Sequence, residues 1–385
     1  MTQQELDILC DPAISALIEE NINLSATDVA LRLQSPHRAL IATQIKYLNR
    51  ARTKLPDYYN ARCILPSLAF EQSSSERVAA TKQHMGDVAI DLTCGLGVDS
   101  YFLSKRFKRV ITIERNPVLA QLAIENFRRL GADNIEVVCA DSAEYLALLN
   151  EKVDLIYADP DRRSAEGRKL VLLEECSPNI LAIRNDLERL SDRIVLKLSP
   201  MFDTAEAIRL FSPCRIEAIS DGGECKELVV EFGKSVCCDE FQATIAGVDS
   251  KRIISKGLVR HGEFHPEQYK YLVLSDVALR KIGLACDYLA DKVDFVASPT
   301  GYAFSESAIE DTLCRCFELE AIEPYSPKEL RRELKAAKVK SIDILKRDFR
   351  LSSSDIAKAL GVGEGGKKRL AFTEIDGKMW QIRIK

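Results

Sequence analysis

The 385-residue sequence lacks the marks of a membrane protein, a secreted disulfide scaffold or a zinc protein. It has no run of about eighteen uncharged apolar residues, which argues against a membrane-spanning helix. The 12 cysteines are scattered without any C-x-x-C, and the 4 histidines do not fall at zinc-ligand spacings. The start, MTQQELDILC, carries acids and no basic segment, so no secretion signal is expected. We therefore expect a cytoplasmic protein with reduced cysteines and no metal.

The net charge of −4 hides an uneven distribution of charged residues. Residues 324–385 contain 16 Lys and Arg against 8 Asp and Glu, a local charge of +8 that leaves −12 for the rest. An excess of one sign in part of a chain can indicate a surface that faces a polyanion. A solvated lysine-rich helix face would look similar, so charge alone leaves nucleic acid and an ordinary surface both open.

Hydrophobic spacing predicts how the chain is organised. Residues 1–65 show the three- and four-residue spacing of helices. From Asp87, short β-branched runs alternate with helical segments, which predicts a mostly parallel, doubly wound sheet. The runs KELVVEFG and FQATIAGV have no helix between them and predict a terminal antiparallel hairpin. Residues beyond Val248 mix strands and helices, and the chain ends in a predicted hairpin at Asp376-Gly377.

Each of the first four predicted strands of the sheet ends at a carboxylate. These residues are Asp91, Glu114, Asp141 and Asp159. In open parallel sheets, ligands bind outside the carboxyl ends of the strands, so the four acids should lie near one site. Each acid could instead cap the following helix. Four acids on four successive strand ends favour the ligand site.

The loop after the first strand favours a nucleoside with a positively charged tail over a dinucleotide. Gly95 and Gly97 allow a ligand to approach the backbone, but the third glycine of G-x-G-x-x-G is Ser100 here. Glu114 could accept both hydrogen bonds of a ribose diol. Asp91 would repel a pyrophosphate and suits an amine or a sulfonium. S-adenosylmethionine combines these features.

The segment from VAIDLTCGLG to IEVVCAD resembles class I S-adenosylmethionine-dependent methyltransferases. It is especially similar to the trimethylguanosine synthase and RNA methyltransferase branch, where D-x-x-C-G-x-G opens the domain. The order of motifs resembles a bacterial group that ends in a THUMP-like domain and carries E-Q-x-S-S-E, D-P-x-R-R and G-E-C-K-E. These motifs begin here at Glu71, Asp159 and Gly223.

The resemblance implies an architecture for the whole chain. A helical segment (1–65) precedes a Rossmann-like α/β domain (66–248) with a seven-stranded sheet and a terminal antiparallel hairpin. A small α+β, ferredoxin-like domain (249–322) and a basic THUMP-like domain (323–385) follow.

The resemblance also implies a site for S-adenosylmethionine. Its predicted members are Gln72, Ser74, Asp91, Thr93, Cys94, Gly95, Gly97, Glu114, Arg115, Asn116, Asp141 and Ser142. Asp91, Cys94 and the two glycines would line the methionine half of the cofactor. Glu114 would bind the ribose, and Asp141 with Ser142 would contact the adenine. Gln72 and the serines after it would close the pocket.

The end of the fourth strand gives the candidate catalytic residues Asp159, Pro160, Arg162 and Arg163. In amino-methylating relatives this strand ends in Asn/Asp-Pro-Pro and an aromatic residue that stacks on the base. Here Asp161 replaces the second proline and Arg162 the aromatic, so that stacking role cannot be carried over. Asp159 can still accept a hydrogen bond from a target amine or act as a base. The arginines could bind a phosphate or carboxylate, or one could simply hold the loop through an ion pair.

Three functions fit these observations. The first is a methyltransferase acting on a structured RNA, tRNA or rRNA, with the basic tail docking the substrate. In the tail, Lys328, Arg331, Arg332, Lys335 and Lys338 fall at helical spacings that predict one basic stripe. The second is a small-molecule or protein methyltransferase with an anionic substrate. The third is a cofactor-binding RNA-interaction protein without turnover, suggested by the missing aromatic residue.

Overall fold

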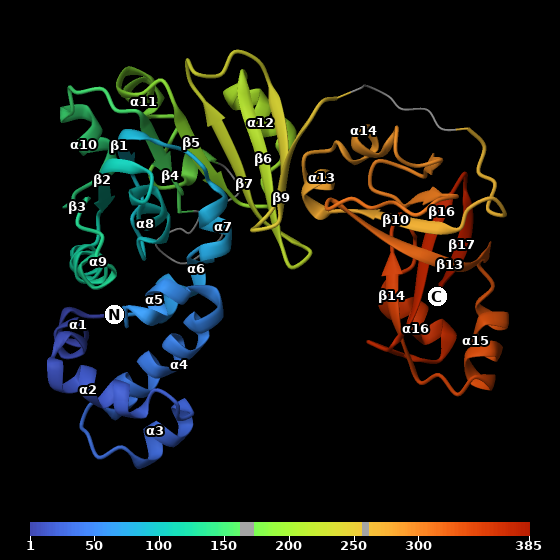
Figure 1. Ribbon diagram of the computed structural model, residues 1–385, viewed down its shortest axis with the longest axis horizontal. Coiled ribbons are helices and arrows are strands. Elements are labelled where there is room, and N and C mark those ends of the chain that lie inside the picture. Colours follow the sequence, from blue (N-terminus) through green and yellow to red (C-terminus); the bar gives the residue numbers. More distant parts are fainter. Residues whose placement is uncertain (162–172, 256–261) are drawn as a thin grey trace. The chain divides into compact units, whose positions relative to one another are not determined.

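A computed structural model describes residues 1–161, 173–255 and 262–385 (Figure 1). Arg162 and Arg163 therefore lie outside the described residues. The chain forms two compact units, residues 1–215 with 227–239 and residues 216–226 with 240–385. None of the helices in these described ranges is long and apolar enough to cross a membrane.

The first 81 residues are helical, as predicted for most of this segment. The helices are α1 (Gln3–Cys10), α2 (Pro12–Asn21), α3 (Ala26–Arg32), α4 (Arg38–Lys54), α5 (Pro56–Asn60), α6 (Ser67–Gln72) and α7 (Glu76–Thr81). Apolar residues of α4, such as Ile41 and Ile45, are fully buried. They belong to the same hydrophobic cluster as Leu96, Val98 and Phe102. The helical segment and the domain that follows it therefore share a core.

A nine-stranded sheet follows, with the order β3-β2-β1-β4-β5-β7-β6-β8-β9 (Figure 1). Its strands are β1 (Gly86–Asp91), β2 (Phe107–Glu114), β3 (Ile135–Cys139), β4 (Leu155–Ala158), β5 (Ile194–Leu198), β6 (Cys214–Asp221), β7 (Glu224–Phe232), β8 (Glu240–Ile245) and β9 (Asp249–Ile253). Strands β1 to β5 pair in parallel. The first seven positions of this order are the Rossmann-like sheet of class I methyltransferases, and the predicted fold class is confirmed.

Helices connect the parallel strands, and local signals fix their ends. The connecting helices are α8 (Val98–Ser104), α9 (Pro117–Leu130), α10 (Ser142–Leu148), α11 (Arg184–Leu190) and α12 (Thr204–Phe211), with a short 3-10 turn at Leu173–Glu175. Helix α9 begins at Pro117 and ends before Gly131, whose φ of +66° suits glycine.

The predicted hairpin of KELVVEFG with FQATIAGV is wrong. The first run is β7, which lies between β5 and β6, and the second is β8, which lies between β6 and β9. Strand β7 runs antiparallel to β5, and β8 runs antiparallel to β9. The close glycine pair Gly222 and Gly223, both with positive φ, allows a tight turn between β6 and β7. The absence of a helix between two strands therefore did not identify their partners.

The C-terminal unit contains an eight-stranded sheet of order β11-β12-β10-β13-β17-β16-β14-β15. Its elements are β10 (Tyr271–Ser275), α13 (Val277–Lys281), α14 (Ala285–Leu289), β11 (Phe295–Val296), β12 (Ala303–Ser305), β13 (Cys314–Pro324), α15 (Pro327–Ala336), β14 (Ser341–Lys346), α16 (Ser353–Leu360), β15 (Gly363–Glu364), β16 (Lys368–Ile375) and β17 (Lys378–Ile384). The predicted hairpin at Asp376-Gly377 is present, since β16 and β17 pair antiparallel around it.

The predicted boundary between residues 322 and 323 falls inside β13. This strand pairs with β10 on one side and with β17 on the other. The two predicted domains therefore share one sheet, and the boundary between them is corrected. Long strands such as β13 can belong to two supersecondary units, which the local pattern does not reveal.

A buried carboxyl on α7 gives a testable stability prediction. Glu76 is 8% exposed and accepts hydrogen bonds from the backbone N–H groups of Asp57 and Tyr58. Burial, together with the charge of Asp57, raises the pKa of Glu76 to about 7. When folding raises the pKa of a carboxyl, the protein loses stability with rising pH. The loss occurs between the pKa of the group in the unfolded state and its pKa in the folded state.

We therefore expect Glu76→Gln to gain stability over the wild type as the pH rises. Between about pH 5 and about pH 8, the difference in unfolding free energy should grow by about 2 kcal/mol in favour of the variant. Urea titrations at the two pH values measure this difference. Equal differences at both pH values would contradict the assigned role of Glu76.

Candidate active site

The predicted strand ends meet at one edge of the sheet. In the parallel register, Asp91 at the end of β1 lies beside Thr112 of β2 and Tyr157 of β4. Glu114 ends β2, and Asp159 directly follows β4. The carboxylates predicted to share an edge therefore come from neighbouring strands.

The loop after β1 is shaped by its two glycines. Gly95 has a φ of +55°, and no heavy atom lies within 4 Å of the place where a Cβ would stand. Gly97 has a φ of +83°, and a Cβ there would lie 2.5 Å from the ring of Phe127. Gly97 is therefore fixed by close packing, whereas Gly95 leaves open space where a ligand can approach the backbone.

Glu114 holds this loop in place. Its Oε2 accepts a hydrogen bond from the Gly95 N–H at 3.0 Å, and its Oε1 accepts one from the Asn116 N–H at 2.9 Å. A carboxylate offers about four acceptor positions, so two remain for a ligand. The predicted contact of Glu114 with a ribose stays a prediction.

Asp91 is enclosed by the protein. It has no exposed surface and accepts hydrogen bonds from the Thr93 N–H, the Thr93 hydroxyl and the Ser100 hydroxyl. Burial raises the pKa of its carboxyl to about 6. Its predicted contact with the methionine half of a cofactor stays a prediction. Its visible role is to hold the loop that begins at Thr93.

Cys94 is also buried in this loop. Its backbone N–H donates to Ile113 O at 3.0 Å, and its side chain is 5% exposed. Burial raises the pKa of the Cys94 thiol well above its ordinary value, so the thiol stays protonated. A protonated thiol is a poor nucleophile, so Cys94 is no candidate for covalent catalysis. All 12 cysteines of the chain are free thiols.

The residues predicted near the adenine lie at helix starts. Asp141 is exposed and caps α10 by accepting from the Ala143 and Glu144 N–H groups. Ser142 is buried, and its hydroxyl donates to Leu92 O at 2.7 Å. The capping role considered for Asp141 is therefore present, and its contact with adenine stays a prediction.

The remaining predicted cofactor residues differ in their exposure and in their hydrogen-bond partners. Asn116 is exposed and caps α9, and Arg115 is exposed and donates to the Ser177 hydroxyl at 3.0 Å. Gln72 is exposed at the end of α6. Ser74 is buried, and its hydroxyl donates to Glu227. Their contacts with a cofactor stay predictions.

Asp159 stands between the loop of β1 and strand β5. Its backbone N–H donates to the Thr93 hydroxyl at 2.7 Å, and its Oδ2 lies 2.5 Å from the Lys197 ammonium. The side chain is 39% exposed, so it can reach a substrate. Desolvation raises the pKa of the Asp159 carboxyl, and the charge of Lys197 opposes this rise. Asp159 is an accessible acceptor tied to the glycine loop.

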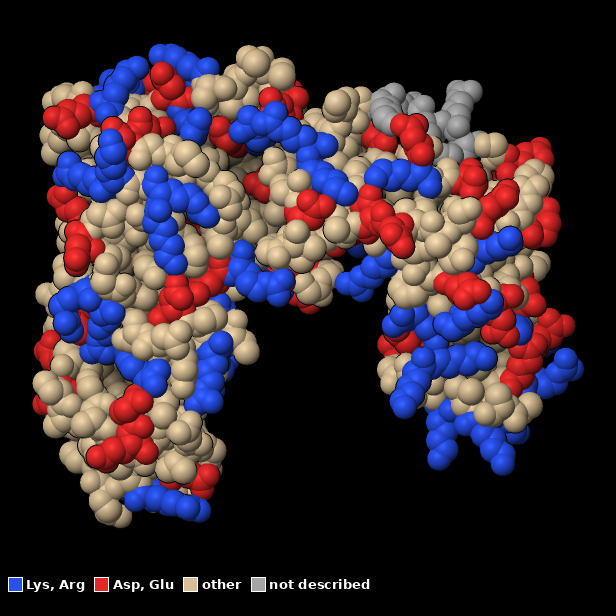
Figure 2. All heavy atoms as spheres, viewed as in Figure 1, with Lys and Arg blue, Asp and Glu red and all other residues tan. Residues whose placement is uncertain are grey.

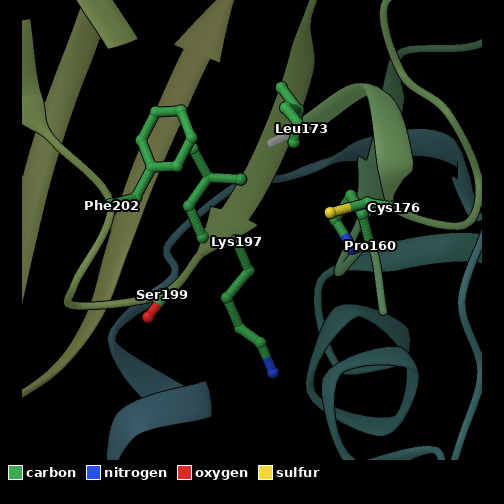
Figure 3. A pocket seen from close by; sticks show the side chains of 7 residues that line it. Pro160, Leu173, Cys176, Lys197, Ser199 and Phe202 are labelled. Carbon is green, nitrogen blue, oxygen red and sulfur yellow. The ribbon is translucent and has the colours of Figure 1, made fainter. Parts of the chain in front are cut away.

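A small pocket lies at Pro160 and Lys197, the neighbours of Asp159 in sequence and in its ion pair (Figure 3). Its lining consists of Pro160, Leu173, Cys176, Lys197, Leu198, Ser199 and Phe202. In Figure 3, Pro160 and Cys176 lie on one side and Phe202 on the other, with Lys197 between them. The predicted residue Pro160 thus lies at a pocket, whereas Arg162 and Arg163 are outside the described residues.

Sequence reasoning missed a buried group of charges at this edge. Lys82 lies 2.7 Å from Asp99 and 2.8 Å from Glu227, and Lys197 lies 3.4 Å from Asp99. The exposed fractions of these four side chains are between 4% and 13%. The signal that could have found the group is Lys197, a charged residue inside the otherwise apolar strand IVLKL.

Comparisons with known proteins agree with the fold. Residues 69–170 match the family described as "Putative SAM-dependent methyltransferase", and residues 314–384 match the family described as "THUMP domain-like". The crystal structure of a "putative methyltransferase from Porphyromonas gingivalis W83" is 27% identical, with a TM-score of 0.79 over 99% of this chain and 98% of that one.

Two curated relatives match only in part. "Ribosomal RNA small subunit methyltransferase J" of Coxiella burnetii (strain RSA 331 / Henzerling II) is 33% identical over 141 residues, which cover 31% of this chain and 54% of the relative. An "Uncharacterized RNA methyltransferase" of Thermosynechococcus vestitus is 33% identical over 95 residues, 24% of this chain and 21% of the relative. The chain thus spans about half the length of the ribosomal RNA relatives it matches.

The order of the sheet and the family match together define a class I methyltransferase domain. The chain thus carries an S-adenosylmethionine-dependent methyltransferase domain that matches over residues 69–170 and a THUMP-like domain that matches over residues 314–384.

Proposed function

We propose that this chain transfers a methyl group from S-adenosylmethionine to RNA. The observation that carries the proposal is the Asp159 carboxylate, a partly exposed acceptor whose backbone is hydrogen-bonded to the glycine loop through Thr93. This places a group able to hold a substrate amine beside the loop where the cofactor would bind. The THUMP-like domain supplies a basic surface for the substrate.

The residues at the glycine loop fit S-adenosylmethionine. Glu114 would accept hydrogen bonds from the ribose hydroxyls, and the open space at Gly95 would admit the ligand to the backbone. When bound, the cofactor supplies a methyl group whose bond to sulfur breaks, with its electron pair staying on sulfur, as the bond to the substrate forms.

Asp159 would orient the substrate amine. By accepting a hydrogen bond from the N–H, its carboxylate directs the nitrogen lone pair toward the methyl group, and it can take the proton that the nitrogen loses. Alignment of this kind can contribute roughly 7–11 kcal/mol, so no covalent intermediate is needed.

One face of α15 is a candidate RNA-binding surface. The exposed cations Lys328, Arg331, Arg332 and Lys335 of this helix, with Lys338 just beyond its end at Ala336, form what we call the basic face. Leu330 and Leu334, on another side of the helix, are buried. Figure 2 shows Lys and Arg side chains gathered over the part of this unit that carries α15 and α16. Among the described residues, these five cations form no ion pair, so they remain available to phosphates.

A glycine-rich loop extends the basic face. Gly363 N–H donates to Lys340 O at 2.8 Å, and a Cβ at Gly366 would lie 2.0 Å from Ser341 O. The loop therefore packs against the start of β14. It leads into β16, where Lys368 pairs with Ile342 of β14.

Neutralising two residues of the basic face tests the RNA proposal. For Arg332→Ala/Lys335→Ala, we expect weaker RNA binding and a slope of log K against log salt that is less steep by about 1.5. A matched control, Arg350→Ala/Lys385→Ala, removes the same charge from cations that are paired with Glu374 and Glu318. Fluorescence anisotropy with total RNA fragments at several salt concentrations measures both slopes. Equal slopes for wild type and the first variant would contradict an RNA-binding role of α15.

The class of RNA also belongs to this proposal. Relatives named as ribosomal RNA small subunit methyltransferases support an rRNA substrate, and tRNA is the other predicted class. The cytoplasmic location stays a prediction from the sequence.

A further inference from the structure

Lys197 occupies the centre of the buried charges next to the transfer site. The register of the sheet places Lys197 beside Val229, so Glu227, two residues earlier on β7, points to the same face of the sheet. Asp159, two residues after Tyr157, shares this face, because Tyr157 pairs with Val195. Three neighbouring strands therefore direct charged side chains to one place.

All three N–H donors of the Lys197 ammonium have an acceptor. Its Nζ lies 2.5 Å from Asp159 Oδ2, 3.1 Å from Ser74 Oγ and 3.4 Å from Asp99 Oδ2. An ammonium group has three donors and no acceptor, so this set fixes its direction. The side chain is 10% exposed, which leaves it little freedom to move into solvent.

We propose that Lys197 is a positioning residue of the methyl-transfer site, which holds the Asp159 carboxylate oriented and ionised beside the substrate amine. The inference rests on the proposed function and adds to it the group on which Asp159 depends. Without Lys197, Asp159 would face the negative charges of Asp99 and Glu227 with no cation to balance them, and the uncharged acid would be favoured. An uncharged carboxyl could no longer take the proton of the amine.

Lys197 does not itself serve as the base. Its neighbours Asp159, Asp99 and Glu227 raise the pKa of its ammonium well above the ordinary value. It therefore keeps its proton at neutral pH and acts through its charge.

The surrounding ion pairs give a role to two sequence motifs. The Ser74 hydroxyl, in the segment from Glu71 to Glu76, donates to Glu227 at 2.5 Å. Glu227 closes the motif that begins at Gly223, and it pairs with Lys82. Residues of both motifs therefore surround Lys197, since Ser74 Oγ lies 3.1 Å and Glu227 Oε1 lies 4.0 Å from its Nζ.

Lys82 provides a matched control for Lys197. It is 4% exposed and pairs with Asp99 and Glu227, so Lys82→Met removes a similar buried charge. Lys197→Met removes the ammonium that contacts Asp159, and Lys197→Arg keeps a cation there. Calorimetric binding of S-adenosylmethionine verifies that each variant is folded.

The first measurement is the titration of the Asp159 carboxyl by carbon-13 NMR in the protein alone, assigned with Asp159→Asn. Since an opposite charge at this distance lowers a carboxyl pKa, Lys197→Met should raise the titration midpoint by about one pH unit or more. Lys82→Met should raise it by clearly less, and Lys197→Arg should keep it near the wild-type value. Unchanged midpoints in Lys197→Met, or equal shifts in both Met variants, would overturn the inference.

The second measurement is the pH dependence of methyl transfer to RNA. In Lys197→Met, the acid limb of the profile should move to higher pH by the shift that the titration gives. In Lys197→Arg, the acid limb should lie near its wild-type position. If the wild type labels RNA and the limb does not move, the inference is wrong. If the wild type labels no RNA at any pH, the proposed function is wrong, whatever the titration gives.

Discussion

Asp159→Asn should lower the rate of methyl transfer by about 10²–10⁴-fold, while cofactor affinity stays near the wild-type value. Asparagine keeps the shape of the side chain, but it cannot take a proton, and its amide is a poorer partner for Lys197. The backbone hydrogen bond from residue 159 to the Thr93 hydroxyl does not depend on the side chain and should persist. Single-turnover transfer of labelled methyl, with cofactor binding followed by calorimetry, separates the two effects.

Asp161→Asn is the matched control for this substitution. Asp161 lies two residues further along, is exposed, and pairs with Ser177 through its backbone N–H and C=O groups. Its substitution should change the transfer rate by less than about threefold, since surface changes have small effects. If the two variants lose activity equally, or if Asp159→Asn loses none, Asp159 is not the acceptor.

Glu114→Gln should weaken the binding of S-adenosylmethionine by about 10- to 100-fold. A hydrogen bond to a charged group is worth about 1.5–3 kcal/mol, and each 1.4 kcal/mol is about a tenfold change in Kd. The glutamine also offers only one acceptor oxygen to the Gly95 and Asn116 N–H groups that the carboxylate now satisfies. Calorimetry with S-adenosylmethionine, and separately with S-adenosylhomocysteine, measures the loss.

Glu136→Gln is the control for the cofactor site. Glu136 lies on β3, next to β2, is 52% exposed and pairs with Arg109 rather than with the glycine loop. Its substitution should leave the Kd of the cofactor unchanged. Wild-type affinity in Glu114→Gln would show that the nucleoside does not bind at the end of β2.

The sequence could predict that the carboxylates at the strand ends meet at one edge of the sheet, because few rules govern this arrangement. A chain that alternates strands and helices gives parallel strands, and the ends of parallel strands meet at one edge. Asp91, Glu114 and Asp159 could therefore be grouped from their positions alone. The direction in which each side chain points could not be predicted, because it depends on packing in the folded protein. Asp91 turns into the protein, whereas Asp159 stays accessible.

Partners from distant strands were not predictable in the same way. Lys197 was not predicted as a site residue. Its three acceptors belong to Ser74, Asp99 and Asp159, which lie far from it in sequence. The place of β7 between β5 and β6 was missed for a related reason. Strand order depends on tertiary packing, whereas alternation of strands and helices is visible locally.

The central claim is most directly tested by incubating the protein with labelled S-adenosylmethionine and total RNA from cells that lack it, with Asp159→Asn as the blank. The account predicts label in one RNA species with the wild type and almost none with the variant. Absence of label in every RNA, despite calorimetric binding of the cofactor, would contradict an RNA methyltransferase. It would direct the search to an anionic small molecule or protein, or to a protein that binds RNA without turnover.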